Sequence, residues 1–387
     1  MPTRRMVVVL ALVTLVLLGA PQVARGAGDP PLSIDPAAAL AALHCPATLA
    51  HPKTPVLLVH GTGSTVEESW THTFAKTLPL DGHDVCTIDL PQRALVDAQI
   101  SAEYVVVAMH TMAGRAGRKI DVVGHSQGGL EPRWALKWFP STRSLVDDYV
   151  SISSTQHGSA DADGICTVGS CAPSVWQQRT TSQFLKALNA GDETPGDLSY
   201  TSIYSLTDEV VPELPPPSTS RLDGARNIAL QDVCPGRPAD HFSILWDAVA
   251  EALVMDALDH PGPADPARLG AAVCLGVIAP GLDAADVAYM HTVALANAFQ
   301  TTVVTGPMSS TEPPLKPYVL ATQAAAAPSP APAAGGPPAP STPAPSPRAN
   351  APMVQGKSLA ATGGRAPLGG AAALLGLALA LKRMKRS

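Results

Sequence analysis

Short apolar runs recur along the central part of the chain. They show no strict alternation with polar residues, which predicts strands buried on both faces. These runs are Pro55–Val59, Val85–Ile88, Ile120–Val123, Tyr149–Ile152, Ser202–Leu206 and Asn227–Leu230. Segments with a helical period lie between them, the clearest being Ala102–Met112, Gly128–Phe139 and Ser243–Leu258. Alternating strands and helices predict an α/β fold, a mostly parallel sheet with helices on both faces.

The N-terminal segment has the three-part pattern of a secretory signal peptide. Arg4 and Arg5 precede an apolar run from Met6 to Leu18, and the small residues Ala24 and Gly26 follow. A membrane anchor is the alternative, but the run is shorter than the roughly 20 residues that a spanning helix needs. We therefore expect residues 1–26 to be removed on export, by either the general or the twin-arginine route.

The C-terminal region predicts a spacer followed by an anchoring signal. Residues 323–357 are rich in Ala, Pro, Ser and Gly, a composition typical of a disordered, extended spacer or of a plain tail. In residues 358–387, Leu-Ala-Ala-Thr-Gly precedes an apolar run from Leu368 to Leu381 and a basic end. This order resembles the Leu-Ala-x-Thr-Gly sorting signal of bacterial, above all actinobacterial, cell-wall proteins. A lipid-linked eukaryotic anchor is the alternative, but such a signal normally ends on its apolar run.

The sorting signal implies a processing partner and a location. The resemblance implies that a sortase cuts between Thr362 and Gly363 and joins Thr362 to the wall. The protein would then be secreted and anchored to the cell wall. Residues 27–322 remain as one α/β domain, which is large enough for a single substantial core.

Charge and cysteine content narrow the function further. The formal net charge is −6, so nucleic acid is not an expected partner. The chain has 6 cysteines, and an even count in an exported protein favours three disulfides, among which fifteen pairings are open. A metal site is not predicted from them, because no Cys-x-x-Cys occurs and none has a neighbouring histidine at zinc-site spacing.

A candidate nucleophile follows the third predicted strand. The sequence Gly124-His125-Ser126-Gln127-Gly128 is Gly-x-Ser-x-Gly between a strand and a helix. This motif places the serine on a sharp turn above the sheet, and the two glycines leave room for that turn. The start of the following helix favours negative charge at this point. The alternative is an ordinary turn between a strand and a helix.

The acid and the histidine of an α/β-hydrolase triad follow the serine in chain order. Asp208 comes directly after a predicted strand and is the candidate acid, with Glu209 and Asp232 as rivals. His241 opens a helix after the last predicted strand and is the candidate base. His260 is the alternative, but it follows that helix beside a proline.

An oxyanion hole needs donors that are in place before the charge develops. The backbone N–H of Gln127, the residue after the nucleophile, is one candidate. The glycine-rich segment after the first predicted strand supplies the second, with Thr62 offering its N–H and its hydroxyl. A plain glycine-rich turn is the alternative; a phosphate loop is not expected because its Gly-Lys pattern is absent.

Together these residues resemble the Candida antarctica lipase B family and its bacterial relatives, roughly from Leu43 to Cys274. The matching stretches are Pro55–Val59 leading to Gly61-Thr62-Gly63, Ser126-Gln127-Gly128-Gly129-Leu130, Phe139-Pro140-Ser141, Ala172–Gln178 and Thr207-Asp208-Glu209. The resemblance implies an α/β-hydrolase lipase with the triad Ser126, Asp208 and His241 and the oxyanion positions Thr62 and Gln127.

The same resemblance implies the disulfide pairing. Cys45 would pair with Cys86, and Cys234 with Cys274, leaving Cys166 and Cys171 to pair in a short lid beside the pocket. Two positions differ from the family. His125 stands where the family member has a tryptophan that shapes the alcohol side of the pocket, and Thr155 stands where it has an aspartate.

We therefore expect a serine lipase or esterase that hydrolyses acylglycerols or other lipophilic esters through an acyl-enzyme. It would need no cofactor and would act as a monomer. An acyltransferase or esterase acting on wall lipids or polyesters is the alternative. A wall-displayed binding module on a disabled hydrolase fold is a third hypothesis, which the intact order of serine, acid and histidine disfavours.

Overall fold

The computed structural model describes residues 28–213 and 219–326. The expected signal peptide, residues 327–357 of the spacer and the sorting signal lie outside the described residues. The last described helix, α13, spans Pro317–Ala326 and so reaches past Thr322, where we placed the end of the domain. Within the described ranges, no helix is long and apolar enough to cross a membrane.

One sheet of seven strands forms the centre of the fold, in the order β1-β3-β2-β4-β5-β6-β7. Its strands are β1 (Leu43–His44), β2 (Val56–Val59), β3 (Val85–Ile88), β4 (Ile120–His125), β5 (Val146–Ile152), β6 (Ser199–Tyr204) and β7 (Arg226–Ala229). All neighbours are parallel except β1, which pairs with β3 in the antiparallel direction. The six predicted strands are confirmed to within a few residues. The two-residue β1 was missed because it is too short to show a pattern.

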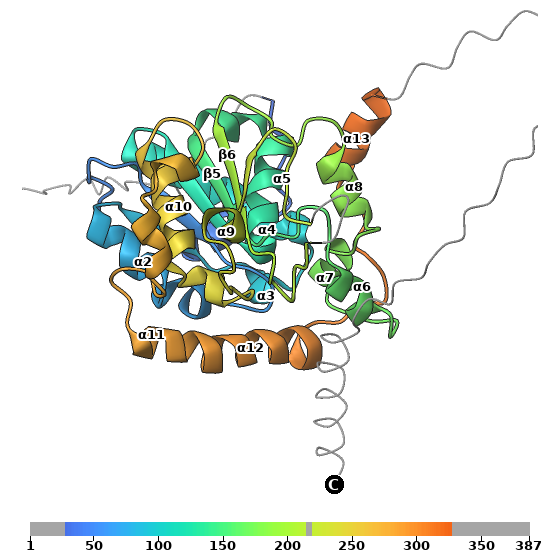
Figure 1. The fold of residues 1–387 in the computed structure, drawn as a ribbon. Helices are drawn as coiled ribbons and strands as arrows, with labels where there is room; N and C mark the ends of the chain where they lie inside the picture. The colour runs from blue at the N-terminus through green and yellow to red at the C-terminus, as the bar shows by residue number, and fades with distance from the viewer. Residues whose placement is uncertain (1–27, 214–218, 327–387) are drawn as a thin grey trace, which may run out of the picture.

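Helices cover both faces of this sheet, as predicted, because its central strands are apolar on both sides (Figure 1). On one face, Leu57 and Val122 pack in a cluster with Met109 of α4 (Ala98–Ala116), and α5 (Leu130–Trp138) contributes to the same cluster. On the other face, Leu58 packs in a cluster with Leu253 of α10 (Ala248–Asp259). The result is a three-layer α/β/α fold.

Two of the predicted helices begin later than expected. The segment predicted as a helix from Gly128 starts with a 3-10 turn over Ser126–Gly129, and α5 follows it. The segment predicted from Ser243 is a 3-10 turn over Ser243–Leu245, and α10 begins only after Asp247. Asp247 ends the first turn because its carboxylate accepts hydrogen bonds from the N–H groups of Val249 and Ala250, which makes it the N-cap of α10.

A long helical segment that the pattern did not predict runs continuously from residue 284 to residue 305. It contains α11 (Ala284–Tyr289), a π-helical turn (Met290–Ala294), α12 (Leu295–Gln300) and a second π-helical turn (Thr301–Thr305). It lies along the lower edge of the molecule in Figure 1. The remaining helices are α1 (Pro36–Ala41), α2 (Phe74–Thr77), α3 (Pro91–Ala94), α6 (Ala160–Cys166), α7 (Pro173–Gln177), α8 (Gln183–Asn189) and α9 (Leu230–Val233).

Three disulfides close the fold, in the pairing that the resemblance implied. Cys45–Cys86 joins the end of β1 to β3, and Cys234–Cys274 closes the loop that contains α10. Cys166–Cys171 joins the end of α6 to the segment before α7. By the loop-closure estimate, a ring of about 40 residues stabilises the fold by about 4 kcal/mol and a ring of six by about 2 kcal/mol.

Candidate active site

Ser126 occupies the sharp turn that the Gly-x-Ser-x-Gly motif predicted. Its φ is +57°, in the left-handed region that non-glycine residues seldom adopt. The flanking glycines permit this turn, because a Cβ on Gly124 would lie 2.1 Å from the carbonyl oxygen of Gly128. A Cβ on Gly128 would lie 2.2 Å from the carbonyl oxygen of Val59 on the neighbouring strand. Backbone strain of this kind is typical of functional sites.

The structure brings together the three residues that sequence order had selected. Ser126 Oγ lies 3.0 Å from Nε2 of His241, and Nδ1 of His241 lies 2.9 Å from Oδ2 of Asp208. Ser126 follows β4, Asp208 follows β6, and His241 lies between β7 and α10. All three are buried, so the hydrogen bonds between them are weakly screened by water.

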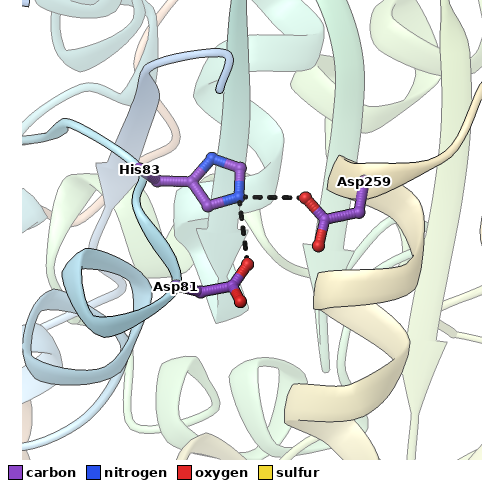
Figure 2. Close-up of side chains that lie close together, drawn as sticks. All are labelled: Asp81, His83 and Asp259. Carbon is purple, nitrogen blue, oxygen red and sulfur yellow. Dashed lines mark ion pairs between the residues drawn. The ribbon is translucent and has the colours of Figure 1, made fainter. Parts of the chain in front are cut away.

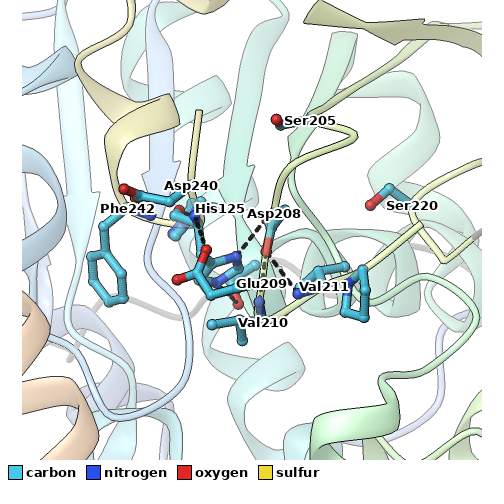
Figure 3. Close-up of polar contacts among 12 residues, drawn as sticks. His125, Ser205, Asp208, Glu209, Val210, Val211, Ser220, Asp240 and Phe242 are labelled. Atoms are coloured by element: carbon cyan, nitrogen blue, oxygen red, sulfur yellow. Dashed lines mark hydrogen bonds and ion pairs between the residues drawn. The ribbon is translucent and has the colours of Figure 1, made fainter. Parts of the chain in front are cut away.

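Backbone N–H groups fix the carboxylate of Asp208. Its Oδ1 accepts hydrogen bonds from the N–H groups of Val210 and Val211, at 2.9 and 2.7 Å, which leaves Oδ2 to face the imidazole (Figure 3). Burial alone would raise the pKa of the Asp208 carboxyl. The neighbouring His241 and the Val211 N–H outweigh burial and hold this pKa below its usual value. Asp208 is therefore charged at neutral pH.

The pKa of His241 is shifted in the opposite direction from that of Asp208. Burial favours the neutral ring, but the Asp208 carboxylate outweighs burial and raises the pKa of His241 above its usual value. The Asp208 bond places a proton on Nδ1, so in the neutral ring Nε2 accepts the Ser126 hydroxyl proton. The geometry can thus move a proton from a hydroxyl to an imidazole, with a carboxylate to stabilise the imidazolium.

The alternative candidates for the acid and the base make other contacts. Glu209 accepts a hydrogen bond from the backbone N–H of His241 and not from its ring. Asp232 lies in α9, and His260 lies past the end of α10, where its Nδ1 donates to the carbonyl of Asp256.

His125 packs against the candidate base. The two imidazole centroids lie 4.7 Å apart, and Nε2 of His125 donates to the backbone carbonyl of His241 at 2.9 Å. Burial, followed by the nearby His241, lowers the pKa of His125 to about 3. The ring is therefore neutral at physiological pH and holds the His241 backbone in place without adding charge.

The candidate oxyanion residues Thr62 and Gln127 are also adjacent. The Thr62 hydroxyl donates to Oε1 of Gln127 at 2.6 Å. Gln127 is the second residue of a helical turn, where backbone N–H groups have no acceptor within the helix. Its side chain is anchored by Nε2, which donates to Oε1 of Glu131 at 2.7 Å.

Gln178 completes this cluster, a role that the sequence interpretation did not assign. Its Nε2 donates to the hydroxyl of Thr62 at 2.9 Å and to Oε1 of Gln127 at 3.0 Å, while Thr155 donates to its Oε1 at 3.0 Å. The only available signal was that Gln178 ends a stretch that resembles the lipase B family.

The loop that carries Thr62 is held from two sides. The N–H of Gly63 donates to the carbonyl of Arg93 at 2.8 Å, and Nε of Arg93 donates back to the carbonyl of Gly63 at 2.8 Å. Thr301, on the long C-terminal helical segment, donates to the same Gly63 carbonyl at 2.7 Å. The unpredicted helix therefore supports the candidate oxyanion loop directly.

The segment with the small disulfide borders the site. Ser159, which caps α6, donates to the carbonyl of Val210 beside the acid. Burial, together with the charges of Glu209 and Asp208, raises the pKa of Asp161 in the first turn of α6. Hence α6 begins close to the acid, where the resemblance placed a lid.

Comparisons with known proteins show which family has this fold and this arrangement of residues. The palmitoyl protein thioesterase family matches residues 55–202. Lipase B of Pseudozyma antarctica is 34% identical over 271 residues, which cover 68% of this chain and 78% of that protein. The crystal structure of Aspergillus fumigatus lipase B superposes with a TM-score of 0.72 at 32% identity, covering 78% of this chain and 75% of that one. Together with the fold, these matches define a carboxylic-ester hydrolase with the α/β-hydrolase fold. The chain belongs to the lipase B family.

Proposed function

We propose that the protein hydrolyses lipophilic carboxylic esters by a two-step covalent mechanism. Ser126 attacks the ester carbonyl carbon, His241 takes the hydroxyl proton, and Asp208 stabilises the imidazolium. The imidazolium then protonates the leaving alcohol, and water attacks the acyl-enzyme by the same route. The observation that carries this proposal is the continuous pair of hydrogen bonds, 3.0 Å and 2.9 Å long, that joins the three side chains.

The oxyanion of each tetrahedral intermediate would be stabilised by the N–H groups of Thr62 and Gln127 and by the Thr62 hydroxyl. In the structure this hydroxyl donates to Gln127 Oε1. It would turn toward the developing charge, where a hydrogen bond is stronger than one to a neutral amide. Gln178, which donates to both partners, would act as a positioning residue.

The test of the mechanism is the Ser126→Ala variant with a nitrophenyl ester. We expect turnover to fall on the order of 10⁴–10⁶-fold, because the nucleophile is lost while the fold is kept. Ser144→Ala is the matched control, since the Ser144 hydroxyl is exposed and only donates to the Ser141 carbonyl. Near-normal turnover in Ser126→Ala would contradict the mechanism.

The proposed substrates are acylglycerols and other lipophilic esters, in keeping with membership of the lipase B family. Hydrolysis rates across nitrophenyl esters and triacylglycerols of increasing chain length test this choice. A rate confined to the shortest acetyl ester would favour a simple esterase.

We propose also that the protein is exported and fixed to a cell wall through Thr362. The proposal is supported by the order of spacer, Leu-Ala-Ala-Thr-Gly, apolar run and basic end along the sequence. In a host with the matching sortase, Thr362→Ala should move esterase activity from the wall fraction to the membrane or medium. Thr342→Ala, in the spacer, is the control. Wall attachment that survives Thr362→Ala would overturn this location.

A further inference from the structure

A polar cluster outside the triad joins the turn before β3 to the last turn of α10. It contains Asp81, His83 and Asp259 (Figure 2). Nε2 of His83 lies 3.4 Å from Oδ1 of Asp259 and 3.8 Å from Oδ2 of Asp81. One ligand atom from each side chain lies within 4.8 Å of the other two. The three residues therefore converge on one point.

The tautomer of His83 makes this arrangement unusual. Nδ1 lies 2.8 Å from the carbonyl oxygen of Thr54, so Nδ1 carries the proton. In the neutral ring, Nε2 then presents a lone pair to two carboxylates. The His83 side chain is 0% exposed, and within the described part of the chain no hydrogen bond reaches Nε2. A buried lone pair that faces two anionic oxygens is repelled by them. Either a proton on Nε2 or a metal cation between the three groups relieves this repulsion.

The distances suit a small transition-metal ion. Zn²⁺ binds imidazole nitrogen and carboxylate oxygen at about 2.0–2.1 Å in tetrahedral geometry, which separates neighbouring ligand atoms by about 3.3 Å. The observed 3.4 Å and 3.8 Å need only a small adjustment. The imidazole donor favours Zn²⁺ over Ca²⁺ or Mg²⁺, which prefer oxygen alone. A bond from the remote ring nitrogen to a backbone carbonyl is also what orients zinc-binding histidines.

Lys53 is the competing cation at this cluster. Its ammonium group donates to Asp81 and, at 2.9 Å, to Asp259. Lys53 supplies one positive charge against the two negative carboxylates. Its ammonium group donates to these carboxylates and makes no hydrogen bond to Nε2 of His83. Its side chain is 34% exposed, so it can turn out to solvent when a metal enters.

We propose that Asp81, His83 and Asp259 form a Zn²⁺ site that ties α10 to the turn before β3. Zn²⁺ binding displaces Lys53 and leaves a fourth position for water. The site is structural, since Asp259 is the last residue of α10 whereas His241 precedes the first turn of this helix. It stabilises the folded state by mass action, because the unfolded chain does not bring the three ligands together.

The proposal is tested by titrating the chelator-treated, full-length protein with ZnCl₂ by calorimetry, and by following Tm. We expect one equivalent to bind and Tm to rise, with no rise for CaCl₂ at the same concentration. His83→Gln and Asp259→Asn should each weaken Zn²⁺ binding at least tenfold. Lys53→Met should strengthen it by about tenfold, because it removes the competing ammonium group.

His44→Gln is the matched control. It removes a histidine from another His–Asp pair, His44–Asp89, which is 3.0 Å long but lies on the surface, and it should leave Zn²⁺ affinity unchanged. Zn²⁺ bound elsewhere, for example at His241, would be insensitive to His83→Gln and Asp259→Asn. Wild-type affinity in both of these variants, or weaker binding in Lys53→Met, would overturn the proposal. Should His83→Gln fail to fold, the more exposed Asp259 and Lys53 variants still decide the question.

Discussion

At the scale of single residues, the site depends on opposite pKa shifts within one pair of side chains. The pKa of Asp208 is lowered and that of His241 is raised, and each shift is caused chiefly by the other group working against burial. His125 and Glu131, also buried, are shifted toward their neutral forms, and burial raises the pKa of Glu131 to about 8. Burial thus keeps these two neighbouring groups neutral, while Asp208 and His241 stabilise each other's charged forms.

The pH dependence of hydrolysis follows from His241. In the proposed mechanism His241 acts as the base and must be neutral. Its raised pKa therefore places the acidic limb of kcat/KM above the ordinary histidine value of about 6.5, and we expect activity to fall as pH drops through this limb. Asp208→Asn should lower kcat on the order of 10⁴-fold and move this limb to lower pH, because the stabilising charge is gone. A pH series on both proteins measures this.

Asp232→Asn, which changes the rival carboxylate in α9, is the control and should leave both kcat and the limb in place. If Asp232→Asn moved the limb and Asp208→Asn did not, the assignment of the acid would be wrong.

At the scale of elements, the site depends on close contact between the turn after β4 and the end of β2. The strained φ of Ser126 is kept because Gly124 and Gly128 let two backbone segments touch. The long C-terminal helical segment then holds the Thr62 loop from outside through Thr301. The proposed nucleophile and the candidate oxyanion donors are thereby placed by backbone packing, before any substrate arrives.

Gly128→Ala tests this packing. The new Cβ would lie 2.2 Å from the Val59 carbonyl oxygen and 2.6 Å from that of His60, so β2 and the turn must move apart. We expect a loss of about 1–3 kcal/mol in the free energy of unfolding and a large loss of kcat. Denaturant unfolding and ester kinetics measure the two effects.

Gly114→Ala in α4 is the matched control, since a Cβ there meets nothing within 4 Å. It should stabilise the protein by up to about 1 kcal/mol, because alanine is a better helix former than glycine. Equal effects of the two substitutions would show that the turn is not tightly packed.

At the scale of the whole molecule, two buried carboxyl groups destabilise the end of the sheet opposite the triad. Asp121 and Asp148 lie buried at the starts of β4 and β5, where the N–H of Asp148 donates to Oδ1 of Asp121. Burial, followed by neighbouring acids, raises the pKa of Asp121 well above its usual value and that of Asp148 to about 7.

These raised values predict how stability varies with pH. A folded-state pKa above the unfolded value means that the folded state keeps its proton to a higher pH than the unfolded state does. This contribution to stability is therefore lost as pH rises from about 4 to about 7. Asp148→Asn should therefore raise the free energy of unfolding at pH 8, by at most a few kcal/mol, and change it little at pH 4.

Denaturant unfolding at the two pH values measures this difference. Asp223→Asn serves as the control, because Asp223 is exposed and is not among the acids that raise the pKa values of Asp121 and Asp148. A gain for Asp148→Asn that is equal at pH 4 and pH 8 would contradict the role of its ionisation.

The sequence by itself determined the alternating strands, the turn around Ser126 and the chain order of Ser126, Asp208 and His241. These features are local patterns, set by hydrophobic periodicity, by glycine next to a strained serine and by position after a strand. Only the tertiary structure decided which groups meet across long separations. Gln178 reaches Thr62, Thr301 holds Gly63, and Asp81 and His83 meet Asp259. Such contacts have no local signal, because the energy that selects them arises when distant segments pack against one sheet.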